Sequence, residues 1–130
     1  MAAELILIVE DNEKNRKLER DILQFHGYRT VEADTAEEGI RLAQATPPAL
    51  VLMDIQLPGM NGIEALQYLR ADPRTRTIPV IAATASVMIQ DRQKIMAAGF
   101  DGYQAKPIEV TQFVAAVRTA VGRPAAGDPP

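Results

Sequence analysis

Five side chains that could carry out chemistry stand at or just after the ends of short, strand-like stretches. They comprise three carboxylates, one hydroxyl and one ammonium group: Glu10, Asp11, Asp54, Thr84 and Lys106. Two carboxylates about 4 Å apart repel each other by roughly 4 kcal/mol at an effective dielectric constant of about 20, so a cation is the natural reason to gather three of them. Oxygen ligands without Cys or His nearby suit a hard ion, and the sequence therefore predicts a Mg2+ site.

The other two groups indicate phosphoryl transfer. An aspartate can accept a phosphoryl group covalently, and cations such as Lys106 offset the charge on the equatorial oxygens. Thr84 would add a hydroxyl donor. Asp54 ends an almost wholly apolar stretch and precedes a loop containing Pro58 and Gly59, so we expect it to be the nucleophile.

Five predicted strands alternate with five predicted helices, and these elements must bring the five side chains together. The strands are expected at 5–9, 28–33, 50–53, 79–83 and 102–105, where apolar stretches are short. The helices are expected at 13–26, 36–45, 61–70, 88–98 and 109–121, where apolar residues recur at helical spacing.

The expected helix faces can be stated by residue. In the helix at 13–26, Leu18, Ile22 and Phe25 fall at helical spacing and are predicted to face the core, while the charged stretch at 13–20 is otherwise a solvated face. Met88 and Met96 are predicted to be packing residues.

Alternation of strand and helix predicts right-handed crossovers and a parallel sheet with helices on both faces. The first, third and fourth strands are almost wholly apolar and belong in the centre, whereas Arg29, Glu32 and Gln104 mark the second and fifth as edges. The order 2-1-3-4-5 satisfies this constraint without being the only order that does. In that order the chemical side chains gather at the carboxyl ends of the strands.

Length and composition exclude several classes of protein. The 130 residues suit one domain, and 47% hydrophobic with 24% charged residues is a globular composition. A net charge of −3 with no basic cluster argues against a nucleic-acid partner, and the absence of cysteine excludes disulfides and thiolate metal sites. Apolar stretches fall far short of the ~20 residues of a membrane span, and no secretory signal is visible, so we expect a cytoplasmic protein without a membrane partner.

The domain is expected at 1–121, followed by a disordered tail rich in Pro, Gly and Ala at 122–130.

Three stretches carry a resemblance to a known family. "ILIVEDN", "LVLMDIQLPGMNG" and "GYQAKP" contain the chemical residues in order, and the chain resembles a response-regulator receiver domain of two-component signalling over about 5–121. The resemblance implies a flavodoxin-like α/β fold with five helices around the five-stranded sheet. Among receivers, the chain most resembles the stand-alone type that regulates kinases or cell-cycle circuits. It also implies no enzyme activity beyond self-phosphorylation from small donors and self-dephosphorylation.

The resemblance implies a role for each matching residue. Asp54 would be the phosphoacceptor and would take its phosphoryl group from a histidine kinase or a histidine phosphotransfer protein. Asp11, Asp54 and the backbone carbonyl of Gln56 would bind Mg2+, and Glu10 would act largely through bound water. Lys106 would pair with the phosphoryl group.

Further matching residues would convert phosphorylation into a conformational change. Thr84, followed by Ala85, would hydrogen-bond to the phosphoryl group, and the switch aromatic Tyr103 would turn inward. Pro107 would follow a cis peptide bond that aims Lys106. Gln56 and Ser86 occupy positions that influence how long the phosphoryl group persists. The signal would pass to a downstream protein through the fourth helix, fifth strand and fifth helix, from a monomer or a weak phosphorylation-dependent dimer.

Two alternatives have less support. A metal-dependent phosphohydrolase with an aspartyl-phosphate would, if of the haloacid-dehalogenase type, carry an acid two residues after its nucleophile. The residue two positions after Asp54 is Gln56, which is not an acid. The residue two positions after Asp11 is Glu13, which stands at a helix start, and no cap insertion is visible. A receiver that acts as an adaptor without phosphorylation would be expected to lack some of the key residues, and all are present here.

Overall fold

Strands and helices alternate along the chain, as the sequence predicts. The computed structural model describes residues 3–85 and 88–122, so Ser86 and the tail at 123–130 lie outside the described residues. The strands are β1 Leu5–Val9, β2 Arg29–Ala33, β3 Leu50–Asp54, β4 Val80–Thr84 and β5 Gly102–Ala105. The helices are α1 Glu13–Phe25, α2 Ala36–Ala45, α3 Gly62–Ala71, α4 Ile89–Ala98 and α5 Val110–Ala120.

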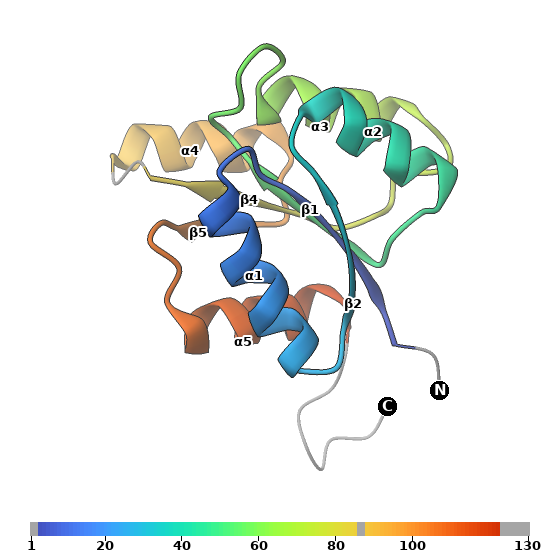
Figure 1. Ribbon diagram of the computed structural model, residues 1–130. Coiled ribbons are helices and arrows are strands. Elements are labelled where there is room, and N and C mark those ends of the chain that lie inside the picture. The colour runs from blue at the N-terminus through green and yellow to red at the C-terminus, as the bar shows by residue number, and fades with distance from the viewer. Residues whose placement is uncertain (1–2, 86–87, 123–130) are drawn as a thin grey trace.

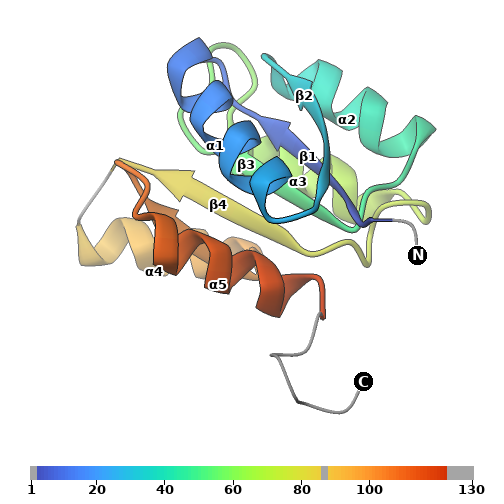
Figure 2. The same ribbon diagram turned by 60° about the horizontal axis from the view of Figure 1, so that its bottom comes forward.

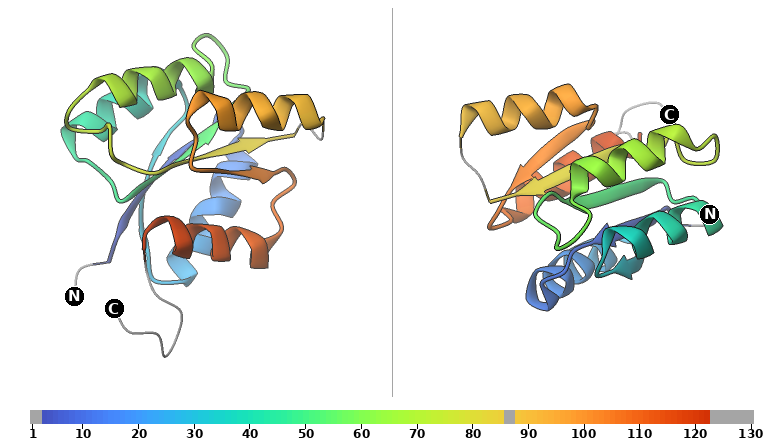
Figure 3. Two further views of the ribbon diagram at one scale, coloured as in Figure 1. Left: turned by 180° about the vertical axis from the view of Figure 1, so that it is seen from behind. Right: turned by 90° about the horizontal axis from the view of Figure 1, so that it is seen from above.

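The five strands form one parallel sheet in the order β2-β1-β3-β4-β5, which confirms the predicted fold class and order. Figure 1 shows α1 and α5 on one face of the sheet and α2, α3 and α4 on the other. The view from behind in Figure 3 shows the same two layers of helices. None of the described helices is long and apolar enough to cross a membrane.

Alternate residues of each central strand enter different halves of the core, because successive side chains of a strand point to opposite faces. In β1, Leu7 and Val9 pack with residues of α2, α3 and α4, whereas Ile6 and Ile8 pack with Leu23 of α1 and with α5. Burial on both faces explains why β1, β3 and β4 read as continuous apolar stretches.

The core-facing side of α1 differs from the prediction. Leu23 and Glu19 are buried, while Leu18 is 42% exposed and Phe25 is 85% exposed. Figure 2 shows α1 and α5 from the side on which they cover the sheet. The prediction that Leu18 and Phe25 face the core is wrong. Helical spacing fits two adjacent stripes of α1, one with Leu18 and Phe25 and one with Glu19 and Leu23, and the sequence favours the first because it has no glutamate. Ile22 lies between these stripes and packs partly against the core.

Met88 and Met96 of the fourth helical region also differ from the prediction. They are 50% and 46% exposed, so they are surface residues rather than core residues. Met88 is the N-cap residue of α4, and Met96 lies one position after the buried Ile95. The apolar character of an unbranched side chain therefore did not indicate its burial here.

The loop "PGMNG" lets α3 begin against the end of β3. Asn61 caps α3 in a reciprocal pair with Glu64, its side chain accepting a hydrogen bond from the Glu64 N–H at 2.9 Å. Gly62, the first helical residue, lies so close to β3 that a Cβ atom there would be 2.5 Å from the carbonyl oxygen of Asp54. A glycine is therefore required beside Asp54 for this close approach.

Candidate functional site

Neighbouring strands bring Glu10 and Asp54 together. Val9 is paired with Met53 in the parallel β1–β3 ladder, so the next residue of each chain segment lies at the same edge of the sheet. Glu10 and Asp54 are 1% and 3% exposed. Asp54 and Thr84 are the last residues of β3 and β4, one residue beyond the predicted strand ends, so the sheet holds both backbones.

Lys106 contacts both buried carboxylates. Its Nζ lies 2.7 Å from Glu10 Oε1 and 3.1 Å from Asp54 Oδ2. The backbone N–H of Lys106 donates to the Thr84 carbonyl at 2.8 Å, which ties the start of this loop to the end of β4. The Lys106–Pro107 peptide bond is cis, the isomer that the resemblance implies. Lys106 thus holds an ammonium group over the gap between two strand ends.

Backbone donors fix the opposite oxygens of the same two carboxylates. The N–H of Gln56 donates to Asp54 Oδ1 at 3.0 Å, and the N–H of Asn12 donates to Glu10 Oε2 at 3.2 Å. Arg16 Nη1 donates to the Glu10 carbonyl at 2.9 Å. The carboxylates therefore have defined orientations in a site that burial and hydrogen bonds keep ordered.

The two buried carboxyl groups have opposite shifts of pKa. Burial, together with a hydrogen bond shared with Asp54, raises the pKa of Glu10 to about 7 against the opposing effect of Lys106. Burial also opposes ionisation of Asp54, but hydrogen bonds from Glu10 and the Gln56 N–H, with the charge of Lys106, lower its pKa below the ordinary value. Burial opposes the charge of Lys106, and the two carboxylates more than offset this, so its pKa is raised. Asp54 is thus the ionised member, as a nucleophile must be.

Three carboxylates could hold a divalent cation. Glu10, Asp11 and Asp54 each offer an oxygen, and these oxygens lie within 4.8 Å of one another. Glu10 and Asp54 are buried, whereas Asp11 is exposed at the mouth of the cluster. An all-oxygen donor set with several negative charges fits Mg2+. Gln56, whose carbonyl was predicted as a ligand, is held beside Asp54 by its own N–H.

The predicted switch residues, Thr84 and Tyr103, have different surroundings. Thr84 is 2% exposed, and the following Ala85 is exposed. A cavity of about 190 Å³ adjoins Thr84 and is lined by Ile55, Gln56, Ile63, Asp91, Lys94 and Ile95 as well. Tyr103 is partly buried against the α2–α4 side of the core, and the Arg92 guanidinium lies 5.3 Å from its ring centroid. Tyr103 is therefore held by other partners rather than by the acidic centre.

Two charged residues of α1 that the sequence did not single out belong to the surroundings of the site. Arg16 bonds the Glu10 carbonyl and also pairs with Glu32 of β2 at 3.2 Å. Glu19 is 2% exposed, which contradicts the expected solvated face at 13–20 for this residue. The sequence signal for its burial was that Glu19 lies four residues before the apolar Leu23, and therefore on the same face of the helix. The charge of Glu19 favoured a solvent-exposed position instead.

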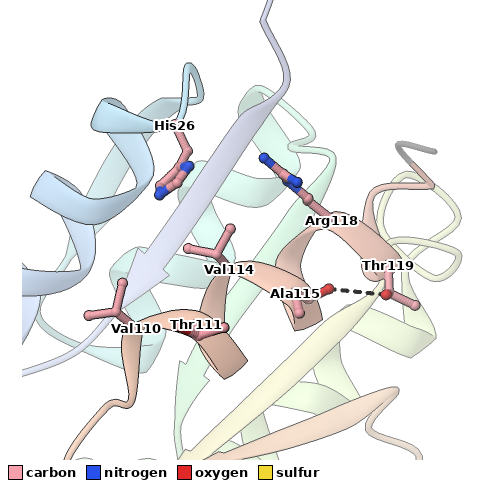
Figure 4. Close-up of a pocket in the computed structure, with 7 residues that line it drawn as sticks. All are labelled: His26, Val110, Thr111, Val114, Ala115, Arg118 and Thr119. Atoms are coloured by element: carbon pink, nitrogen blue, oxygen red, sulfur yellow. Dashed lines mark hydrogen bonds between the residues drawn. The ribbon is translucent and has the colours of Figure 1, made fainter. Parts of the chain in front are cut away.

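A surface groove lies elsewhere on the molecule. It has a volume of about 620 Å³ between the end of α1 and the surface of α5 (Figure 4). Its lining residues are His26, Val110, Thr111, Val114, Ala115, Arg118 and Thr119. The side chain of Phe25 is exposed next to His26, with the two rings edge to face at 5.2 Å between centroids. This groove is separate from the acidic residues.

Comparison with known proteins decides the family. Residues 6–118 match the family model of the response regulator receiver domain. The chain belongs to this family. A relative of this receiver is the polar-differentiation response regulator DivK of Brucella ovis, which is 42% identical over 117 residues, covering 90% of this chain and 95% of DivK.

Solved structures agree with this assignment. A putative response regulator from Chloroflexus aurantiacus superimposes on this receiver with a TM-score of 0.89 and 28% identity, covering 93% of this chain and 99% of the other. The receiver domain of the sensor histidine kinase PA1611 from Pseudomonas aeruginosa gives a TM-score of 0.86 and 31% identity over 93% of this chain and 99% of its own. That structure has a magnesium ion coordinated in its active-site cleft.

Proposed function

We propose that this receiver accepts a phosphoryl group on Asp54 from a phosphohistidine of a histidine kinase or a histidine phosphotransfer protein. The observation that carries the proposal is the double contact of Lys106 with Glu10 and Asp54, at 2.7 and 3.1 Å. It places an ammonium group where negative charge would increase during transfer. The receiver family membership makes two-component signalling the setting of this chemistry.

A carboxylate oxygen of Asp54 forms the new bond to phosphorus while the bond from phosphorus to the histidine nitrogen breaks, and the histidine leaves with the electron pair. The Gln56 N–H holds Asp54 Oδ1, which fixes the carboxylate plane during the attack. Mg2+, held by Glu10, Asp11, Asp54 and the Gln56 carbonyl, would supply positive charge that offsets the charge of the phosphoryl oxygens. Lys106 supplies a further fixed positive charge from the β5 side.

The response would begin at Thr84. Its backbone carbonyl already binds the N–H of Lys106, so a movement of Thr84 toward a phosphoryl group is transmitted to the Lys106–Pro107 loop. The peptide after Thr84, at Ala85, would follow the same movement. Tyr103 would then exchange its present packing and its contact with Arg92 for a more buried position. A modification can shift such a two-state equilibrium only by its differential affinity for the two states.

Two exposed apolar surfaces suit protein partners. At the N-cap of α4 and along it, the exposed large apolar side chains are Met88, Ile89 and Met96, at 50%, 68% and 46%. With β5 and α5, they form the face through which we propose that a downstream protein is bound, by a monomer or a weak phosphorylation-dependent dimer in the cytoplasm. On α1, Leu18 and Phe25 are exposed on the side that we propose for the phosphodonor. Protein contact, rather than turnover of a small substrate, is thus the proposed output.

Intact mass tests the proposal. We expect a single phosphoryl adduct after incubation with a small-molecule phosphodonor, dependent on Mg2+ and absent from Asp54→Ala. Asp34→Ala is the matched control, because Asp34 is an exposed aspartate that follows the edge strand β2. The absence of any adduct on the wild type with every donor, or an unchanged adduct on Asp54→Ala, would contradict the assignment. Steady turnover of a phosphate ester would favour the phosphohydrolase instead.

A further inference from the structure

Arg92 of α4 is a cation that the proposed transfer does not use. Within residues 3–85 and 88–122 it forms no ion pair, and its buried Nε has no hydrogen-bond acceptor. Its guanidinium lies instead over the ring of Tyr103 in β5, 5.3 Å from the ring centroid. An arginine on a surface helix can extend its charged end into water, where its N–H groups are hydrated, so the half-buried position over the ring needs an explanation.

The acid at the start of β5 is bound by other groups. Asp101 Oδ2 pairs with Arg70 Nη2 at 2.9 Å and also accepts a hydrogen bond from the Val80 N–H at 2.8 Å. The two buried carboxylates of the acidic centre are contacted by Lys106. The face of an aromatic ring is electrically negative, and a guanidinium within about 6 Å of the ring centroid is attracted to it. The aromatic ring is therefore the group that offsets the charge of Arg92.

The contact joins α4 to the strand that carries the proposed switch aromatic. Tyr103 is paired with Ala82 in the β4–β5 ladder, and Thr84 ends β4 two residues later. The ring also packs partly against the core on the α2–α4 side. A ring that turns toward Thr84 takes its face away from the guanidinium. The contact therefore exists in only one of the two states, which is the condition for it to bias the equilibrium between them.

We propose that Arg92 stabilises the resting orientation of Tyr103, meaning its orientation in this structure, and so limits the fraction of the unphosphorylated receiver that adopts the switched conformation. This inference rests on the switch at Thr84 and Tyr103 in the proposed function. Arg92 is a positioning residue, because it acts on the phosphorylation site through the Tyr103 ring. The receiver would have to break this contact each time it responds, so Arg92 sets how readily phosphorylation produces the signal.

The effect has an expected size. A cation–π contact changes an equilibrium constant by a factor of about 2 at an exposed site and about 30 when it is desolvated. Removing the charge of Arg92 should therefore raise the ratio of switched to resting receiver about 2- to 30-fold. A phosphoryl mimic at Asp54 favours the switched conformation, so its apparent affinity rises by the same factor while that conformation is the minor one. Mg2+ alone does not recruit Thr84 in the proposed function, so its affinity should stay the same.

Titration of the full chain with beryllofluoride at saturating Mg2+, followed by fluorine NMR, measures this factor. Arg92→Met keeps an unbranched side chain and removes the charge, whereas Arg92→Lys keeps a charge. Arg76→Met is the matched control, because Arg76 is an exposed arginine in the connection between α3 and β4. We expect Arg92→Met to bind beryllofluoride about 2- to 30-fold more tightly than the wild type, Arg92→Lys to lie between the two, and Arg76→Met to match the wild type.

Tyr103→Leu completes a double-mutant cycle that isolates the contact from other effects of Arg92. In the background without the ring, Arg92→Met should not change the affinity for beryllofluoride. Proton NMR of the wild type gives a direct check. The ring current of Tyr103 should shift the side-chain protons of Arg92, and this shift should be lost in Tyr103→Leu and on binding of beryllofluoride.

The outcomes separate the two proposals. If the wild type binds no beryllofluoride, the phosphoacceptor site of the proposed function is wrong. If the wild type binds it and the folded Arg92→Met binds it no more tightly, the inference about Arg92 is overturned. An equal gain in the Tyr103→Leu background also overturns it, because Arg92 would then act without the ring. The NMR check needs no variant of Arg92, so it decides even if Arg92→Met folds poorly: a ring-current shift that persists in the beryllofluoride complex contradicts the inference.

Discussion

Gly62→Ala tests how closely α3 must approach the phosphoacceptor. A Cβ atom at this position would lie 2.5 Å from the carbonyl oxygen of Asp54, 3.0 Å from Cα of Ile55 and 3.1 Å from the carbonyl carbon of Asp54. All three are backbone atoms, so no side chain can rotate away. Either the start of α3 or the end of β3 must move by roughly half an ångström or more to restore an ordinary contact.

Two effects of the substitution oppose each other. Alanine in place of glycine favours a helix by about 1 kcal/mol. Overpacking of a rigid site costs about 1–3 kcal/mol, and here the atoms that resist belong to the sheet and to a capped helix start. We therefore expect Gly62→Ala to lower the free energy of unfolding by about 0–2 kcal/mol in urea titration, with the rigid backbone contacts favouring the upper end. The displacement should also slow phosphorylation of Asp54, because misplacement of a reacting group by a fraction of an ångström is costly.

Gly102→Ala is the matched control for this substitution. The nearest atom to a Cβ at Gly102 is the Ile81 Cγ1 at 3.9 Å, an ordinary contact, and Gly102 lies in β5 away from the Asp54 backbone. Gly102→Ala should leave the rate of phosphorylation unchanged. If Gly62→Ala is instead more stable than the wild type and is phosphorylated at the same rate, then the close approach of α3 to β3 is not a constraint on the site.

Three further predictions address individual charges and packing. Because burial raises the pKa of Glu19 from 4.5 to about 8, the unfolded chain loses its proton first, and wild-type stability should fall as pH rises from 4.5 to 8, by up to about 5 kcal/mol. Glu19→Gln should lack this part of the decline in urea titrations across that range, and parallel curves for variant and wild type would contradict the buried acid. Lys106→Met leaves Glu10 and Asp54 without their ammonium partner, so it should lower stability at pH 7.5 by about 3 kcal/mol without Mg2+ and by less with saturating Mg2+. Equal losses with and without the cation would mean that the cation does not replace Lys106 electrostatically. Leu23→Ala should lower the free energy of unfolding by about 2–5 kcal/mol, whereas Phe25→Ala should change it by less than about 0.5 kcal/mol, since the former is fully buried and the latter 85% exposed. The reverse order of effects in denaturation would restore the core-facing stripe that the sequence favours.

The sheet could be predicted from the sequence because its central strands are buried on both faces. β1, β3 and β4 read as uninterrupted apolar stretches, and polar residues mark β2 and β5 as edges. This pattern allows more than one strand order, and the order 2-1-3-4-5, which satisfies it, is the one that the structure confirms. The same reasoning placed Glu10 and Asp54 at one edge of the sheet. Their joint contact with Lys106 needed the structure, because β4 lies between β3 and β5 and only coordinates show how far the lysine reaches.

The surface of α1 could not be predicted in the same way. A helix shows two neighbouring stripes at nearly the same spacing, and the stripe with Leu18 and Phe25 is more apolar than the stripe with Glu19 and Leu23. The structure selects the second stripe, since Leu23 packs against Ile6 and Ile8 of β1. A charged residue in the core therefore made the prediction fail at a position beside the site.

The formal charges of the site explain why the fold tolerates this arrangement. Three carboxylates, Glu10, Asp11 and Asp54, face one ammonium group, so the cluster carries two uncompensated negative charges when all are ionised. Without a cation, the raised pKa of Glu10 relieves the repulsion, because this group takes up a proton near neutral pH. A divalent cation supplies the two missing positive charges and makes that proton unnecessary. Proton and cation then compete for one negative cluster, and this competition predicts that the receiver binds Mg2+ more weakly as pH falls below about 7.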